Sequence, residues 1–267
     1  MFVLTLCIGL MYGRNAIAQG EWRPSNNSIN QHGWAPIHWA AMKGDTIILK
    51  TEIEAAHRIN TKTIAYGFFK ENPWDSTDYW CDGDCAGEYY QEGTTAIHIA
   101  LCSRLSNINT LKILIRYKAQ PNLQDIDGNT PLHKCIENAE DICTTYYERF
   151  YYLLGIGAKT NIRNLNGETP LHICCKNGTL KYAKALIQYG TEINALTKEN
   201  ETPLHYVCRG EFYEMGGVRG FKNDIGLLLL KLGAKINVKN TKGKTPLDIA
   251  HEFNNTEMVK QIVNYNK

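Results

Sequence analysis

The stretch Thr130-Pro131-Leu132-His133 returns twice along the chain, as Thr169-Pro170-Leu171-His172 and as Thr202-Pro203-Leu204-His205. Three further copies are less regular: Thr245-Pro246-Leu247-Asp248, Thr95-Ala96-Ile97-His98 and Ala35-Pro36-Ile37-His38. Self-similarity at intervals of a few tens of residues is typical of proteins that stack one small structural unit many times. The sequence therefore predicts a repeat architecture.

The spacing between copies indicates two helices in each unit. Proline fits the first helical turn, where its missing N–H costs nothing, and the preceding Thr can cap that turn. A glycine that ends the second helix takes a positive φ. Pro170 to Gly190 is 20 residues and Gly190 to Pro203 is 13, so this unit has 33 residues. The 13-residue step holds turn residues such as Asn166-Gly167, which predict a projecting finger.

This pattern resembles the ankyrin repeat, whose 33-residue unit carries a T-P-L-H-x-A signature. The resemblance spans residues 31–267 and implies a mainly α fold, a solenoid of helix–loop–helix units with β-hairpin fingers. Extra residues lie between the two helices in the third and fifth copies, and an insert of residues 63–90 lengthens the first finger. We expect six repeats, near residues 33–60, 93–124, 128–163, 167–196, 200–239 and 243–267.

The first residues differ from the rest. Met1 to Tyr12 is apolar, and Ala16-Ile17-Ala18 follows, which predicts a signal peptide over residues 1–18 and then a linker over residues 19–30. No Lys or Arg precedes the apolar run, so a buried N-terminal strand or helix is the alternative. The run is shorter than the roughly 20 residues of a membrane span. We expect export to a periplasm or to the outside of the cell, with the cytoplasm as the alternative.

Function follows from charge and from the resemblance. Lys plus Arg number 29 and Asp plus Glu number 27, a balance that lacks the basic footprint of a nucleic-acid-binding protein. The resemblance implies a non-catalytic module that binds another protein through the concave surface formed by the fingers and first helices. We expect a monomer with no cofactor, no metal ion and no membrane span.

The insert is the sharpest candidate for a binding arm. From Glu71 to Glu92 there are seven acidic residues and no basic one. Aromatic residues are enriched at interface hot spots, and acidic flanks steer basic partners. The alternatives are that the rings fold back on the first repeat, or that the carboxylates hold Ca²⁺, although the usual calcium loop is missing. The predicted partner-binding residues are Trp74, Tyr79, Trp80, Asp82, Asp84, Tyr89 and Tyr90.

The cysteines and histidines have structural interpretations. Cys81 and Cys85 lie close together in the insert and form either a disulfide or a pair of thiols, since a zinc site would need two more ligands. The family resemblance implies that the repeated His hydrogen-bonds to the backbone of the adjacent repeat, at His98, His133, His172 and His205. Cysteines of the first helices are expected to be buried, namely Cys102, Cys135, Cys174, Cys175 and Cys208.

Enzyme motifs are missing from the sequence. There is no G-x-S-x-G, H-E-x-x-H or G-x-x-x-x-G-K-[ST] pattern. The stretch from Gly155 to Thr160 resembles a phosphate-binding loop, but we expect it to end a helix. The rival hypotheses are an enzyme or metal-binding protein with its site in residues 63–90, and a stabilising or redox-protective partner of an exported enzyme.

Overall fold

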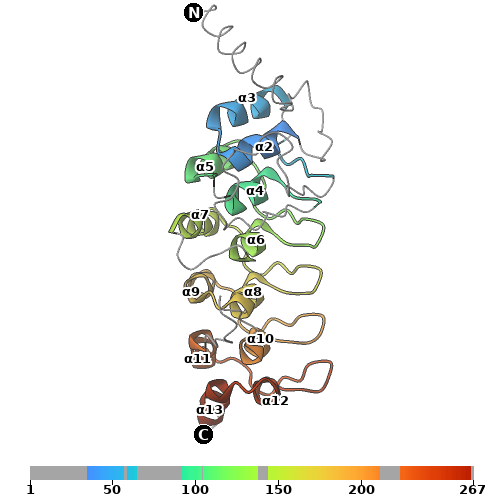
Figure 1. Cartoon of the computed structure of the whole chain (residues 1–267), viewed down its shortest axis with the longest axis vertical. Helices are drawn as coiled ribbons and strands as arrows, with labels where there is room; N and C mark the ends of the chain where they lie inside the picture. Colours follow the sequence, from blue (N-terminus) through green and yellow to red (C-terminus); the bar gives the residue numbers. More distant parts are fainter. Residues whose placement is uncertain are drawn as a thin grey trace, which may run out of the picture. The chain divides into compact units, whose positions relative to one another are not determined.

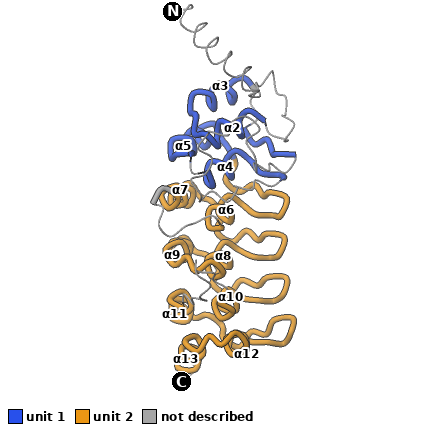
Figure 2. Tube along the Cα trace, in the orientation of Figure 1, with its two compact units in different colours: residues 1–119 blue, residues 120–267 orange. Residues whose placement is uncertain are grey.

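A computed structural model describes residues 35–56, 59–64, 92–103, 105–137, 144–210 and 223–265. The predicted signal peptide, the linker and most of the insert lie outside these residues. The chain divides into two compact units, residues 1–119 and residues 120–267, which are coloured separately in Figure 2 and are described here one at a time. None of the helices in the described ranges is long and apolar enough to cross a membrane.

Helices dominate both units (Figure 1). Unit 1 contains α2 (Pro36–Lys43), α3 (Thr46–Ala56), α4 (Ala96–Cys102) and α5 (Ile108–Arg116). Unit 2 contains α6 (Pro131–Glu137), α7 (Thr144–Gly155), α8 (Pro170–Asn177), α9 (Leu180–Gln188), α10 (Pro203–Arg209), α11 (Asp224–Lys231), α12 (Pro246–Glu252) and α13 (Thr256–Tyr265). The mainly α, helix–loop–helix prediction is confirmed.

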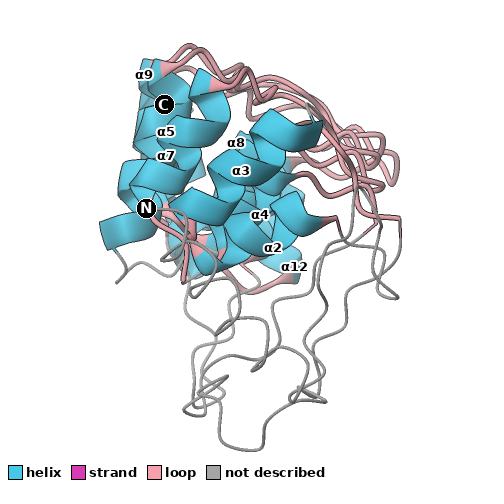
Figure 3. Cartoon of the chain, turned by 90° about the horizontal axis from the view of Figure 1, so that it is seen from above, coloured by secondary structure: helices cyan, strands magenta, loops and turns pink. Residues whose placement is uncertain are grey.

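The fingers are loops in the part of the chain that the structure describes, and the predicted β-hairpins are not confirmed. Figure 3 shows pink loops and no strand among these residues, and the only β-type pairing there is an isolated antiparallel bridge between Lys62 and Thr95. Thr63 also donates its N–H to the Thr94 carbonyl at 2.9 Å. These bonds hold the two ends of the insert side by side, so the first finger can be long without opening its base.

The first helices of the regular repeats begin at the signature proline. Thr169, which precedes Pro170, has an extended backbone, and its N–H donates to Nδ1 of His172 at 3.1 Å. Since Nδ1 accepts this hydrogen bond and so carries no proton, the Thr169 hydroxyl also donates to Nδ1, at 2.9 Å. The same pair of bonds caps the N-termini of α4, α6 and α10. In α12, Asp248 takes the place of the His. This reciprocal capping fixes the start of each helix.

Stacking of neighbouring repeats forms the core of unit 2. The first helices pack in the order α6, α8, α10 and α12, and the second helices pack in the order α7, α9, α11 and α13. The signature leucines Leu132, Leu171 and Leu204 are fully buried between layers. In Figure 1 the fingers of this unit all project from the same side of the first helices. Among the described residues of unit 2, one side is therefore built from fingers and first helices.

Unit 1 is built on the same plan. Helix α2 packs against α3 and α4, and α5 packs against α3 and α4. Leu49, Ile97, Leu101 and Leu111 are fully buried in this unit. Lys118, which aligns with the closing glycines of unit 2, has a φ of 67°. Lys118 lies 13 residues before Pro131, as Gly157, Gly190 and Gly233 lie 13 residues before the prolines that follow them, and all four residues have a left-handed backbone.

Candidate functional site

The residues predicted to bind a partner lie outside the described ranges. These residues are Trp74, Tyr79, Trp80, Asp82, Asp84, Tyr89 and Tyr90, and the Cys81–Cys85 pair lies among them. The binding role of the insert therefore stays a prediction. The other predicted element, the surface of fingers and first helices, is described in full for most of unit 2, and we call its exposed part the finger surface.

The repeated histidines join one repeat to the next. His133 donates from Nε2 to the Glu168 carbonyl at 3.0 Å, and His172 does the same to the Glu201 carbonyl at 3.3 Å. His205 is placed 3.3 Å from the Lys244 carbonyl. Nδ1 already accepts the capping bonds, so the proton lies on Nε2. The structural interpretation of these histidines is confirmed, and their role is to position the base of each finger.

Burial keeps these rings neutral. It lowers the pKa of both His133 and His172 from 6.5 to about 4, although the hydrogen bonds to backbone carbonyls act in the opposite direction. The pKa of His205 is also lowered by burial. In unit 1, His38 donates to the Thr61 carbonyl at 2.9 Å instead of to the residue before the next signature.

In each finger of unit 2, one side chain at the base makes a hydrogen bond that closes the loop. The side-chain oxygen five residues before the signature Thr accepts the N–H of the residue just before that Thr. This closes a tight loop of the Asx or Ser/Thr type. The pairs are Asp125 with Asn129 (2.8 Å), Asn164 with Glu168 (2.9 Å), Thr197 with Glu201 (3.2 Å) and Asn240 with Lys244 (3.0 Å).

Neighbouring fingertips are joined through their backbones. The N–H of one tip donates to a carbonyl of the preceding tip, and this bond repeats along unit 2. A second tie runs near the end of each repeat, where Asn122, Asn161 and Asn194 accept backbone N–H groups of the next repeat at 2.8 to 2.9 Å. The tip bonds are Leu165 to Asp127 (2.8 Å), Lys198 to Asn166 (3.0 Å) and Thr241 to Glu199 (2.9 Å).

The side chains of the tips change character along the unit. Ile126 and Leu165 at the first two tips are 43% and 58% exposed, although both are large and apolar. The corresponding positions at the last two tips are Lys198 and Thr241, which are also exposed. The finger surface thus passes from apolar tips to polar and charged ones.

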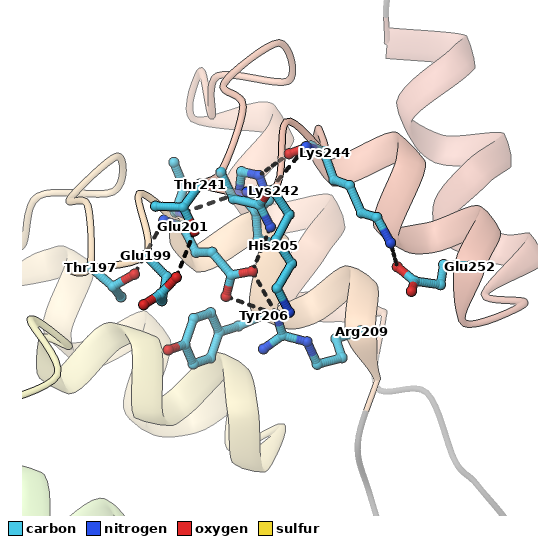
Figure 4. A network of polar contacts seen from close by, with 12 residues as sticks. Thr197, Glu199, Glu201, His205, Tyr206, Arg209, Thr241, Lys242, Lys244 and Glu252 are labelled. Carbon is cyan, nitrogen blue, oxygen red and sulfur yellow. Dashed lines mark hydrogen bonds and ion pairs between the residues drawn. The ribbon is translucent and has the colours of Figure 1, made fainter.

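A polar network lies on the first helix α10 (Figure 4). The Tyr206 hydroxyl donates to Oε1 of Glu168 at 2.8 Å. Arg209, one turn further along the helix, donates from Nη2 to both carboxylate oxygens of Glu201, at 2.6 and 2.8 Å. The Arg209 guanidinium also lies 5.5 Å from the centre of the Tyr206 ring. Both side chains are half-buried, so each presents part of its surface to solvent.

The Glu168 carboxylate of this network is buried yet ionised. Burial by itself would raise the pKa of Glu168, but hydrogen bonds from Asn164, Tyr206 and Asn166 outweigh burial and leave the pKa below its ordinary value. Burial, followed by the charge of Glu168 and its hydrogen bond, raises the pKa of Tyr206 far above its usual range. At neutral pH the pair is therefore a neutral phenol held by a carboxylate. Such a pair fixes a side chain in place rather than moving a proton.

The five cysteines among the described residues are buried. Cys102, Cys135, Cys174, Cys175 and Cys208 are all inaccessible thiols, which confirms the predicted burial. Burial raises the pKa of Cys174 to about 12 and those of Cys175 and Cys208 further. The phosphate-loop-like stretch ends helix α7, with Gly157 at a φ of 89°, as predicted. No group of three or more metal-binding side chains occurs among the residues with described positions.

Sequence reasoning missed Tyr206, Arg209, Glu168 and Glu201. Each pair joins a helix residue to a residue just before a signature Thr, and the Tyr206–Glu168 pair spans 38 residues. A comparison of equivalent positions between repeats could have identified the two glutamates as candidate site residues. Glu168 and Glu201 share one position, which lies next to the repeated Thr and is expected to be buried.

Comparison with known proteins agrees with this geometry. A family model described as ankyrin repeats (3 copies) matches residues 75–147 and 144–216, which together make up more than half of the chain. No curated protein sequence matches the chain.

Proposed function

The chain belongs to the ankyrin-repeat family, and from that premise we propose that it binds a protein partner through the finger surface of unit 2, with Tyr206 and Arg209 at the centre of the contact. Ankyrin repeats indicate a protein–protein interaction module. The observation that carries the proposed centre is the fixed, half-exposed pair of Tyr206 and Arg209 on α10.

The chemistry of this pair suits a binding hot spot. Tyr and Arg are two of the residue types most enriched at hot spots. Each is held in place by a buried carboxylate, Glu168 for Tyr206 and Glu201 for Arg209. A side chain that is already ordered loses little conformational entropy when a partner binds, and that cost is about 0.5–1.5 kcal/mol for each flexible side chain. The pair is therefore preorganised for contact.

The surroundings of the pair provide a mixed rim. The tips carry the exposed apolar residues Ile126 and Leu165, and the far end carries the exposed Lys244–Glu252 ion pair at 2.7 Å. Interfaces commonly combine an apolar or aromatic centre with a polar rim. We propose that the apolar tips add buried area and that the ion pair adds orientation rather than affinity, since exposed pairs contribute little.

The proposal extends to the segments outside the described residues. The insert serves as a second binding arm through Trp74, Tyr79, Trp80, Asp82, Asp84, Tyr89 and Tyr90, and its support is the concentration of aromatic and acidic residues there. The chain acts as a monomeric, non-catalytic module, exported after cleavage behind Ala18, as a secreted or periplasmic effector. The support for export is the apolar run and the Ala16-Ile17-Ala18 site.

A cross-linking and titration experiment tests the proposed centre. The full chain is used to capture its partner from the native source, and the affinity of the purified pair is then measured by calorimetry. Tyr206→Ala combined with Arg209→Ala is expected to weaken binding at least about 30-fold, because two hot-spot truncations each cost more than 1 kcal/mol. Deletion of residues 63–90 measures the contribution of the insert separately.

The matched control is Tyr189→Ala combined with Lys184→Ala. These are an exposed tyrosine and an exposed lysine in the layer of second helices. The control is expected to leave affinity unchanged, and circular dichroism confirms that each variant is folded. If both double variants bind equally well, the finger surface is not the contact. If only the deletion weakens binding, the insert alone carries the function.

A further inference from the structure

The last described finger is unusually basic. Its sequence from Lys235 to Lys244 reads KINVKNTKGK, and no acidic residue occurs between Asp224 and Asp248. The side chains of Lys235, Lys239 and Lys242 are exposed. Lys198, on the tip of the preceding finger, is exposed as well. The backbone bond from Thr241 to Glu199 places these two tips next to each other.

Four lysines of these two fingers differ from Lys134, Arg209 and Lys244, which each have an ion-pair partner. Lys134 lies 2.9 Å from Glu137, Arg209 lies 2.6 Å from Glu201, and Lys244 lies 2.7 Å from Glu252. Within the described ranges, no carboxylate comes within ion-pair distance of the four exposed lysines of these two fingers, Lys198, Lys235, Lys239 and Lys242. Asp248 is affected by the charge of Lys239, but its pKa is lowered mainly by hydrogen bonds with Thr245.

The basic finger is held firmly on both sides. Thr241 donates its hydroxyl to Oε2 of Glu199 at 2.6 Å, in addition to the backbone bond between the tips. Asn200 donates from Nδ2 to the Lys239 carbonyl at 2.6 Å. The Lys235 N–H donates to Asn194, and His205 holds the Lys244 carbonyl. The lysine side chains therefore extend from a fixed backbone, as Figure 4 shows for Lys242 and Lys244.

We propose that Lys198, Lys235, Lys239 and Lys242 bind an acidic polypeptide segment of the partner. This inference rests on the proposed function, since it names the chemistry of the partner that the finger surface recognises. A group of exposed positive charges without ion-pair partners raises the association rate with an acidic surface and helps to fix its orientation. A protein segment fits better than nucleic acid, because the formal net charge of the whole chain is only +2.

The test uses the full chain and defined probes. A fluorescent 12-residue peptide of alternating Glu and Gly is expected to bind the wild-type chain at 50 mM salt and to bind much more weakly at 300 mM salt, because salt screens the contacts. The triple variant Lys198→Gln/Lys239→Gln/Lys242→Gln is expected to bind this peptide about fivefold to tenfold more weakly, since exposed ion pairs contribute up to about 1 kcal/mol each. The matched control Lys181→Gln/Lys184→Gln/Lys231→Gln removes three exposed lysines of the second helices α9 and α11 and is expected to change nothing.

Three results would overturn the inference. The first is equal binding of the acidic peptide by the triple variant and the wild type. The second is equal weakening by the control variant of the second helices. The third is tighter wild-type binding of a 20-nucleotide single strand or of phosphatidylserine vesicles than of the peptide, which would assign the basic finger to nucleic acid or to a membrane. A Gln-for-Glu version of the peptide confirms that charge is what the chain recognises.

Failure here is distinguishable from failure of the proposed function. If the triple variant binds the acidic peptide normally while Tyr206→Ala/Arg209→Ala still weakens the natural partner, only the acidic-segment inference is wrong. If the triple variant loses the peptide and the Tyr206/Arg209 variant keeps the natural partner, the proposed centre of the contact is wrong and the basic finger stands.

Discussion

His172 donates from Nε2 to the backbone carbonyl of Glu201, 29 residues further along the chain. Nδ1 of the same ring accepts both the N–H and the hydroxyl of Thr169. One imidazole therefore caps the N-terminus of its own helix and hydrogen-bonds to the base of the next finger. It makes both sets of bonds only in the neutral form with the proton on Nε2. Protonation of Nδ1 removes two acceptor bonds at once.

Acid is therefore expected to destabilise the protein through these rings. His133 and His172 have a folded pKa of about 4 against an ordinary 6.5, so the unfolded chain binds their protons more tightly. Their contribution is fully present above about pH 6.5 and is lost as pH falls toward 4, at about 1.4 kcal/mol per pH unit for each ring. Urea unfolding at pH 7, 6 and 5 measures this slope. His172→Gln is expected to reduce the slope and the exposed His251→Gln to leave it unchanged; equal slopes in all three proteins would contradict the prediction.

Loss of the Tyr206 hydroxyl is expected to cost stability. Tyr206→Phe leaves Glu168 buried with its bonds to Asn164 and Asn166 but without the phenol, a change worth about 1–2 kcal/mol in the free energy of unfolding. Urea unfolding at pH 7 measures the difference. Tyr189→Phe removes a hydroxyl from an exposed ring and is the matched control, with an expected change within about 0.5 kcal/mol. Equal effects of the two variants would show that the Tyr206–Glu168 bond contributes nothing.

Lys118 holds a backbone conformation that suits glycine. Its φ of 67° costs a side-chain-bearing residue about 1–2 kcal/mol, partly offset by the greater flexibility of glycine in the unfolded chain. Lys118→Gly is therefore expected to raise the free energy of unfolding by up to about 1 kcal/mol. The reverse change, Gly190→Ala, is expected to lower it by about 1 kcal/mol, because its φ is 78° and only backbone strain, not crowding, opposes the methyl group.

Gly155→Ala is the control for this pair, since Gly155 ends α7 with open space around it and without a left-handed φ. Alanine is the better helix former, so this variant should be neutral or slightly stabilising. Thermal unfolding of the three variants checks the order. Destabilisation by Lys118→Gly would show that the lysine side chain makes a contribution larger than its backbone strain.

The buried cysteines are expected to resist alkylation in the folded protein. Cys174, Cys175 and Cys208 are buried, and burial keeps them protonated, with a pKa of about 12 for Cys174. The thiolate is the reactive form, so both access and ionisation oppose the reaction. Peptide mass spectrometry after treatment with N-ethylmaleimide at pH 7 is expected to find these residues unmodified. The same treatment in guanidinium chloride should modify all three, and rapid labelling without denaturant would mean that the α8–α10 layer opens easily.

Much of the fold was predictable because local chemistry and the repeat agree. Pro131, Pro170, Pro203 and Pro246 each begin a first helix, and the closing positions from Lys118 to Gly233 are left-handed as aligned. The family resemblance implied β-hairpins, but the two arms of a described finger of unit 2 share only one backbone bond at its base, as from the Asn164 N–H to the Glu168 carbonyl, because the Glu168 N–H is bonded to the side chain of Asn164. Turn chemistry alone does not separate these two outcomes.

The candidate site was less predictable for a physical reason. The bond between Tyr206 and Glu168 joins two neighbouring repeats, so it depends on the distance between them. A sequence pattern within one repeat does not give that distance. Aromatic enrichment instead directed the prediction to the insert, which lies outside the described residues. The role of His133 and His172 was predictable because it follows from the family signature and depends only on equivalent backbone atoms.

The ladder between fingertips has a consequence for how such a surface can change over time. The bonds from Leu165 to Asp127, from Lys198 to Asn166 and from Thr241 to Glu199 join amide and carbonyl groups, which every non-proline residue supplies. Substitution at a tip therefore changes the side chain that the finger surface exposes without removing the backbone hydrogen bond between neighbouring tips. Mutation can exchange the tips one at a time, and a laboratory can do the same, so the specificity of this chain is open to retargeting while its scaffold is retained.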